Sequence, residues 1–235
     1  PVEPEDRVHY IIRKFLLNTD YIKIDDLAEE LIVSRSTLQK DLKDVKVILR
    51  KFNLSFDKRP NYGLSLVGNE RHIRNAMSEL LFKRNTVFHM DYLNQDWLLD
   101  KNEIQIIQEI ILKKLKQYNL NLSDIALNNL VVHIAIACKR IQSQQYAQLA
   151  NIDNNDIIKK KEHDVAKSIL HDIESKLNYS FPPVEITYVT MHLLGTKLFL
   201  DSEKTQPLSA LDQEIIDVVD RVIKTVDRRL ALHVS

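Results

Sequence analysis

The fold is decided by the stretch from Ile24 to Leu38, which reads IDDLAEELIVSRSTL. Asp25 and Ser34 have side-chain oxygens that can accept from the free backbone N–H groups at a helix start, so each is predicted to be an N-cap. The apolar residues between them are expected on one helical face: Ile24, Leu27, Leu31 and Ile32. Two short helices joined by a tight turn are therefore predicted.

The second of these helices is predicted to be amphipathic. Its apolar residues repeat at helical spacing and form one buried stripe: Leu38, Leu42, Val45, Leu49 and Phe52. The opposite face is polar and basic, with Arg35, Ser36, Gln39, Lys40, Lys43, Lys46 and Arg50. Two tightly joined helices, the second basic on its outer face, are the helix-turn-helix pattern, in which the second helix enters the DNA major groove.

A β-hairpin is predicted directly after this helix. Apolar residues alternate on both sides of a basic turn at 58–63 (KRPNYG), as in two strands: Leu54, Phe56, Leu64 and Leu66. A hairpin in this position is the wing of a winged helix. Residues 35–59 hold eight Lys or Arg and three Asp, a net charge of +5 in a chain of net charge zero. This charge favours contact with phosphate, although a solvated basic helix would show it too.

Residues 24–38 and 59–70 (RPNYGLSLVGNE) resemble the Mga-type winged helix of bacterial transcription regulators. In that module a small residue usually occupies the helix-helix turn, where this chain has Leu31, Ile32 and Val33. The resemblance implies binding to an operator DNA. The residues expected nearest the bases are Arg35, Ser36, Thr37, Gln39, Lys40 and Lys43, and those expected at phosphate or in the minor groove are Lys58 and Arg59.

Composition favours a mostly α-helical protein of two domains. The 235 residues include only three glycines and six prolines, and the hydrophobic fraction of 44% can supply real cores. No apolar run approaches the roughly 18 residues of a membrane span, and no signal peptide is visible. The single cysteine, Cys138, allows no intrachain disulfide, which is typical of a cytoplasmic protein.

The predicted organisation has three parts. Residues 1–86 form the winged helix, with a first helix around Val8 to Leu16 and a last one over 70–82; residues 87–205 form an all-helical bundle; residues 206–235 are a linker and the start of a further helical domain. The charge divides in the same way: residues 1–86 hold 16 Lys or Arg and 13 Asp or Glu, whereas the remainder holds 17 and 20. Pro1 and the unfinished helical pattern at the other end predict a fragment of a longer chain.

The bundle is expected to contain four helices, over 103–118, 125–141, 157–177 and 184–199, with Ser123 and Asp124 starting the second of them. His133 interrupts a helix that is apolar nearly all round, and His192 lies in another helix. A histidine in such a helix needs partners for its ring nitrogens. The other six histidines lie in charged or mixed contexts and are predicted at the surface.

Four roles are open for His133 and His192. Each could be an ordinary core histidine with satisfied ring nitrogens. A metal site has little support, because Cys138 lies on a different side of the helix and no spacing matches a zinc pattern. Acid–base catalysis would need a cleft with carboxylates. A neutral imidazole can also accept a phosphoryl group, which places negative charge at one point of the structure.

Residues 129–141 (NLVVHIAIACKRI) and 185–197 (EITYVTMHLLGTK) resemble the two histidine motifs of a PRD, the phosphotransferase-system regulation domain. The resemblance implies that His133 and His192 accept phosphoryl groups from the carrier HPr or from a sugar-specific enzyme IIB. It also implies a homodimer. Leu211 to Ser235 resembles the first helix of a second PRD.

The sequence is thus similar to PRD-containing transcriptional regulators, of the activator type, that control sugar-utilisation operons. This reading predicts no enzymatic activity, no cofactor and no metal. Three alternatives stay open: an RNA-binding antiterminator of the BglG type, a winged helix with a structural role only, and a histidine-dependent enzyme. Antiterminators resemble one another in a small all-β domain before the first PRD, where this chain has a predicted helix-turn-helix.

Overall fold

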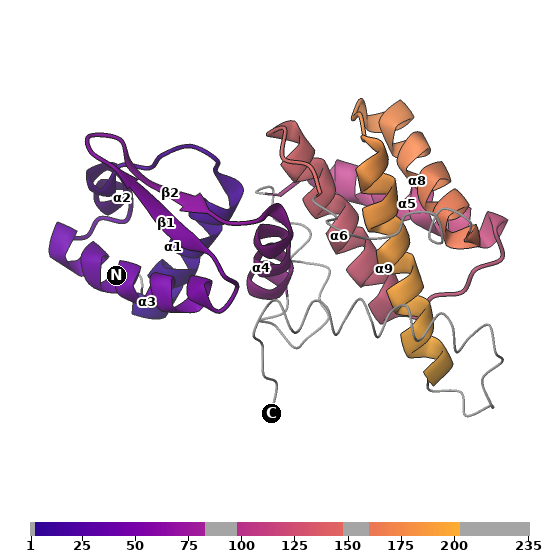
Figure 1. Cartoon of the computed structure of the whole chain (residues 1–235), viewed down its shortest axis with the longest axis horizontal. Helices are drawn as coiled ribbons and strands as arrows, with labels where there is room; N and C mark the ends of the chain where they lie inside the picture. The colour runs from indigo at the N-terminus through magenta and orange to yellow at the C-terminus, as the bar shows by residue number, and fades with distance from the viewer. Residues whose placement is uncertain (1–2, 83–97, 148–159, 203–235) are drawn as a thin grey trace. The chain divides into compact units, whose positions relative to one another are not determined.

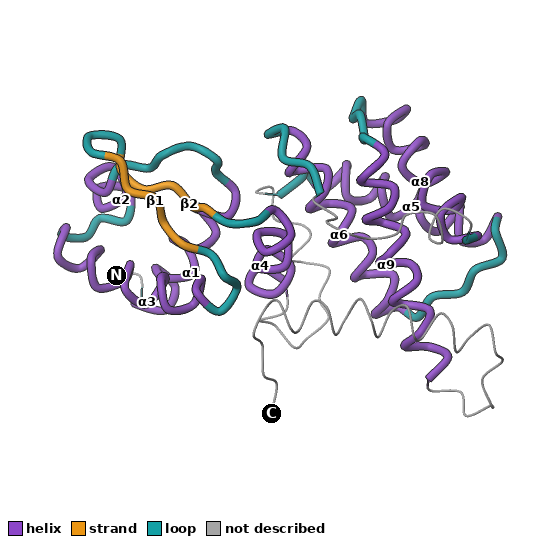
Figure 2. The backbone as a smooth tube through the Cα atoms, in the orientation of Figure 1, coloured by secondary structure: helices purple, strands orange, loops and turns teal. Residues whose placement is uncertain are grey.

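The computed structural model describes residues 3–82, 98–147 and 160–202. These residues form eight helices and one two-stranded sheet, so the prediction of a mostly helical protein is confirmed (Figures 1 and 2). The chain separates into two compact units, residues 1–87 and 88–235.

The first unit is a winged helix. It contains, in order, α1 (Pro4–Leu17), α2 (Ile24–Glu30), α3 (Arg35–Arg50), β1 (Ser55–Arg59), β2 (Gly63–Val67) and α4 (Glu70–Phe82) (Figure 1). Helix α3 packs against α1 and α2, α4 packs against α1, and the β-hairpin contacts both α1 and α3. The predicted apolar faces are buried. Their buried residues are Val8, Ile11, Ile12, Phe15 and Leu16 in α1 and Leu38, Leu42, Val45 and Leu49 in α3. Phe52, which was predicted to end the stripe of α3, follows the helix and is half-buried.

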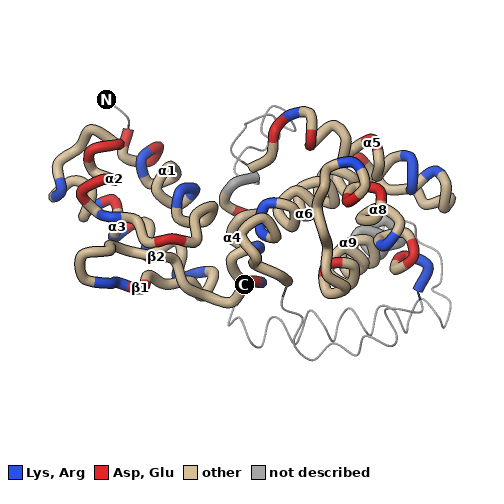
Figure 3. The backbone as a smooth tube through the Cα atoms, turned by 90° about the horizontal axis from the view of Figure 1, so that it is seen from above, with Lys and Arg blue, Asp and Glu red and all other residues tan. Residues whose placement is uncertain are grey.

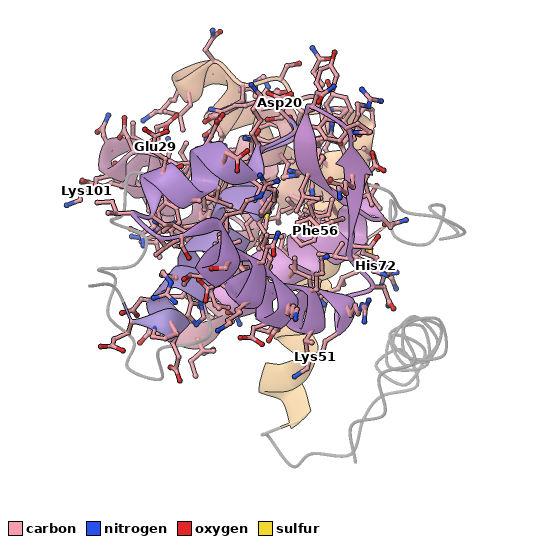
Figure 4. The ribbon with its side chains drawn as sticks, turned by 90° about the vertical axis from the view of Figure 1, so that its left-hand side faces the viewer. Asp20, Glu29, Lys51, Phe56, His72 and Lys101 are labelled. Atoms are coloured by element: carbon pink, nitrogen blue, oxygen red, sulfur yellow. The ribbon has the colours of Figure 1, made fainter. Side chains whose placement is uncertain are left out.

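Aromatic packing joins the hairpin to this core. The rings of Phe15 in α1 and Phe56 in β1 lie edge to face, with their centroids 4.6 Å apart. Figure 4 shows Phe56 toward the interior of the unit, with the exposed residues Asp20 and Lys51 at opposite ends. Apolar contact therefore holds the hairpin on α1, and β1 also contacts α3, as a wing requires.

The buried face of α3 also contains a carboxylate. Asp41 is buried and accepts two hydrogen bonds from the Arg7 guanidinium, from Nε at 2.8 Å and from Nη2 at 3.1 Å. This bidentate contact raises the pKa of Arg7 and ties α1 to α3. The buried face of α3 is therefore apolar except for this one polar pair, which links α3 to α1.

Helix α2 differs from its prediction at both ends. Its N-cap position is Lys23, which makes no side-chain capping bond, so the prediction that Asp25 caps this helix is wrong. Asp25 lies in the first turn instead, where a carboxylate is favourable to the helix dipole. Ile32 was expected on the buried face, but it lies beyond the helix and is 92% exposed.

The turn between α2 and α3 is a Schellman motif. The N–H of Ile32 donates to the Glu29 carbonyl at 3.0 Å, and that of Val33 donates to the Ala28 carbonyl at 3.0 Å. These bonds require a left-handed residue, and Ile32 supplies it with a φ of +53°. Glycine or asparagine usually occupies this position, because a β-branched residue is strained there.

Replacing Ile32 with asparagine is expected to raise the free energy of unfolding of the winged-helix unit by about 1 kcal/mol. Asparagine tolerates the left-handed conformation, and an almost fully exposed side chain loses little burial. Urea unfolding, monitored by amide exchange in α3, measures the change in the free energy of unfolding. Val47, an exposed β-branched residue within α3, is the matched control, and Val47→Asn should give no stabilisation. Equal effects of the two changes would contradict the strain at Ile32.

The wing is an antiparallel hairpin with Ser55 opposite Val67 and Arg59 opposite Gly63. Lys58 and Arg59 therefore lie in β1, not in the turn as predicted. A further backbone bridge pairs Ile22 with Leu64, so the segment between α1 and α2 extends the sheet. Gly63 has a φ of +108°, and a Cβ there would lie 2.0 Å from the Ile22 carbonyl oxygen. Only glycine permits this close approach.

The described residues of the second unit form a bundle of four helices: α5 (Lys101–Gln117), α6 (Asp124–Gln142), α8 (Lys161–Leu177) and α9 (Pro183–Ser202). Helix α5 packs against α6 and α8, and α9 packs against the same two helices. Asp100 starts α5 with a capping box to Glu103, and Ser123 caps α6 as predicted. Pro183 lies in the first position of α9, where its missing N–H is harmless.

Several predictions fall on residues outside the described ranges. They include most of the connection at 83–102, between the helices predicted over 70–82 and 103–118, the start of the third bundle helix at 157, and the further helical domain at 206–235. Of that connection, Leu98 and Leu99 are described and buried. Among the described residues, no helix is long and apolar enough to cross a membrane.

Candidate functional site

The N-terminus of α3 is ordered by a hydroxyl cluster. Ser34 is its N-cap, as predicted: the Oγ atom accepts from the backbone N–H of Thr37 at 3.1 Å. The same oxygen lies 2.8 Å from the Ser36 hydroxyl and 2.9 Å from that of Thr37. Ser36 and Thr37 therefore help to organise the first turn of α3.

The outer face of α3 is open to solvent. Of the six residues predicted nearest the bases, Thr37 is half-buried and the others are exposed: Arg35, Ser36, Gln39, Lys40 and Lys43. Arg35 forms an ion pair with Asp25 at 3.1 Å, and both side chains are largely exposed. Such a pair is weak in water, so the guanidinium can exchange it for another anion.

The acidic residues of α2 contrast with this basic surface. Figure 3 shows acidic residues on α2 and basic residues on α3 and β1. One of the acidic residues, Glu30, bonds to Lys14 and Tyr10 of α1. The Lys14 ammonium and the Tyr10 hydroxyl hold the pKa of Glu30 below its usual value. This contact keeps α2 on α1.

The wing holds one of its two predicted cations beside two aromatic rings. The Arg59 guanidinium lies 4.9 Å from the ring centroid of Tyr21 and 5.7 Å from that of Tyr62. Tyr21 also donates a hydrogen bond to Asp57. Lys58 and the Tyr62 ring are exposed. The role of Tyr21 was missed in the sequence, because it lies before α2 and only the sheet bridge at Ile22 brings it to the wing.

The structure brings the two predicted histidines together. The rings of His133 in α6 and His192 in α9 are stacked, with centroids 3.6 Å apart and an angle of 19° between their planes. Both side chains are half-buried. They face each other because α6 and α9 pack together along this part of the bundle. A group that adds charge to one ring would act directly on the other.

Tyr188 completes this cluster. Its hydroxyl lies 3.1 Å from Nδ1 of His133, and its ring lies edge to face with both histidine rings, at 6.1 Å from His133 and 4.6 Å from His192. The sequence offered a signal for it: Tyr188 precedes His192 by four residues, which places both on one face of α9.

The remaining histidines correct one prediction. His171 is exposed as expected, but His9, His72 and His163 are half-buried, and Nδ1 of His163 lies 3.4 Å from the Thr190 hydroxyl. His89 and His233 lie outside the described residues. Within the described ranges, no group of three or more His, Cys, Asp or Glu is placed to hold a metal ion.

The fold and these two sites define a modular chain, in which a winged helix precedes a helical domain with a facing histidine pair. Comparison with protein families identifies both modules: residues 4–81 match the Mga helix-turn-helix domain, and residues 105–196 match the PRD domain. The chain therefore contains a Mga helix-turn-helix domain followed by a PRD domain.

Curated proteins of similar sequence are named as operon or transcription regulators. The chain is 43% identical over its whole length to the probable licABCH operon regulator of Bacillus subtilis (strain 168), of which it covers 36%. It is 27% identical over 221 residues to the transcriptional regulator ManR of the same organism, covering 93% of this chain and 34% of that protein. A match to the putative transcriptional regulator MtlR of Streptococcus mutans has 27% identity over 110 residues, 46% of this chain and 17% of MtlR. The chain thus spans about a third of the first two relatives.

Proposed function

We propose that this chain is the DNA-binding and sensory part of a transcriptional activator of a sugar-utilisation operon. The relatives named as operon and transcription regulators support this proposal, as does the exposed basic face of α3. In the proposal, the α3 residues nearest the bases in the major groove are Arg35, Ser36, Thr37, Gln39, Lys40 and Lys43. Lys58 and Arg59 of the wing contact phosphate or the minor groove.

The observation that carries the sensory role is the stacked pair of His133 and His192. Both rings are half-buried between two helices, so a donor can reach their edges while the bundle responds to added charge. In the proposal, HPr or a sugar-specific enzyme IIB phosphorylates this pair. The new charge changes the packing of α6 and α9 and the geometry of a homodimer, and dimer geometry sets which pair of half-sites is bound.

Phosphotransfer tests the sensory role. The chain is incubated with phosphoenolpyruvate, enzyme I and HPr, with and without an enzyme IIB, and the label is mapped by mass spectrometry. We expect label on His133 or His192, lost in the matching histidine-to-alanine variant. His171→Ala removes an exposed histidine of the same unit and should leave the label unchanged. No label from either donor would assign both histidines to core packing.

A further inference from the structure

Three aromatic side chains from two helices form the histidine site. Tyr188 and His192 lie one helical turn apart on α9, and His133 reaches them from α6. Tyr188 is 9% exposed, whereas both histidine rings are half-buried, so the tyrosine lies on the inner side of the pair. Its hydroxyl lies within hydrogen-bond distance of a ring nitrogen of His133, at 3.1 Å from Nδ1.

The two nitrogens of a neutral imidazole have different chemistry. One bears a proton and donates, while the other has the lone pair and is the nucleophile. A partner that accepts a hydrogen bond from one nitrogen keeps the proton there and leaves the reactive lone pair on the other. A tyrosine hydroxyl at Nδ1 can accept from Nδ1–H or donate to a bare Nδ1, and only the first of these bonds leaves the lone pair on Nε2.

We propose that Tyr188 is a positioning residue, which accepts a hydrogen bond from Nδ1–H of His133 and so makes Nε2 the phosphoryl acceptor. This inference rests on the proposed phosphorylation of His133. Stacking on His192 fixes the plane of the ring, and the bond to Tyr188 fixes its rotation within that plane. The reactive nitrogen is thereby presented in one orientation, which is the advantage of a pre-oriented nucleophile.

The transfer balances with a phosphohistidine donor. The Nε2 lone pair of His133 forms a bond to phosphorus, and the phosphorus–nitrogen bond of the donor breaks with its electron pair going to the donor imidazole. That imidazole takes up a proton, and His133 loses its Nδ1 proton to solvent. The Tyr188 hydroxyl then turns and donates to the bare Nδ1, so the same contact holds both the free and the phosphorylated ring.

Nitrogen NMR of the whole ¹⁵N-labelled chain tests the tautomer without any phosphoryl donor. The His133 signals are assigned by their loss in His133→Ala. We expect the Nδ1–H tautomer in the unchanged chain and a mixture with Nε2–H in Tyr188→Phe. Tyr179→Phe is the matched control, because the Tyr179 hydroxyl bonds to Glu103 and Gln142 instead, and this variant should keep the Nδ1–H form.

Phosphotransfer from phosphorylated HPr gives the second readout. The unchanged chain and Tyr179→Phe should bear phosphate on Nε2 of His133, and Tyr188→Phe should form both isomers at a rate lower by about twofold to tenfold, the range for one lost hydrogen bond. An Nε2–H tautomer in the unchanged chain, or an unaltered Nδ1–H form in Tyr188→Phe, would overturn the inference. Absence of phosphate on His133 would refute the proposed function at that residue, while the tautomer measurement would still decide the role of Tyr188.

Discussion

Replacing Lys40 and Lys43 together with alanine is expected to weaken DNA binding by roughly a hundredfold at physiological salt. Both lysines are exposed on the outer face of α3, three residues apart, so both ammonium groups can reach the phosphates that border one groove. Each cation that neutralises a phosphate releases a counterion on binding. The double change should therefore lower the slope of log K against log salt concentration by about 2.

The measurement uses a DNA duplex that the unchanged chain selects from a random-sequence pool. Binding is titrated by fluorescence anisotropy between low and physiological salt, because loss of cationic contacts changes the salt slope and a small loss of stability does not. Lys113→Ala combined with Lys116→Ala is the matched control, since it removes two exposed lysines with the same spacing from α5 in the other unit. An unchanged affinity and slope would mean that α3 does not contact DNA and that this winged helix has a structural role.

Local patterns were enough to predict most of the winged helix. The apolar period of α1 and α3 and the cap at Ser34 depend on residues within a few positions of one another, and the structure confirms them. The burial of Asp41 could not be predicted from such local patterns. A carboxylate on a buried face is stable only with a partner, and that partner, Arg7, lies 34 residues away.

Local patterns likewise predicted only part of the histidine site. The motifs pointed to His133 and His192 separately, but the stacking of their rings depends on how α6 and α9 pack. The bond between Tyr188 and His133 spans 55 residues and has no local signal. The left-handed conformation of Ile32 could not be predicted for another reason. The turn that ends α2 requires this conformation, whereas isoleucine rarely adopts it.

Gly63→Ala is expected to lower the free energy of unfolding of the winged-helix unit by more than about 3 kcal/mol. The added Cβ would lie 2.0 Å from the carbonyl oxygen and 2.5 Å from the carbonyl carbon of Ile22, both backbone atoms of a paired segment. The φ of +108° strains any side chain in addition. To relieve the contact, the chain must separate Ile22 from Leu64, which breaks the two backbone hydrogen bonds of that bridge.

Gly195→Ala is the matched control, because among the described residues, apart from the neighbouring backbone of α9 itself, no atom lies within 4 Å of a Cβ added at Gly195. It should stabilise the second unit by about 0.5 to 1 kcal/mol, the usual gain on replacing glycine within a helix. Thermal unfolding with amide exchange in α3 and α6 assigns each change to its unit. A Gly63→Ala variant as stable as the unchanged chain would contradict the close approach at Ile22.

The same change separates the two parts of the proposed DNA contact. At a temperature where Gly63→Ala is still folded, α3 keeps its cap at Ser34 and its packing on α1, whereas the hairpin is displaced from Ile22. Tyr21 precedes Ile22, so this displacement also moves its ring away from Arg59. Loss of affinity beyond that of Arg59→Ala alone would then be due to the position of the whole wing. An affinity equal to that of Arg59→Ala would reduce the role of the wing to this one cation.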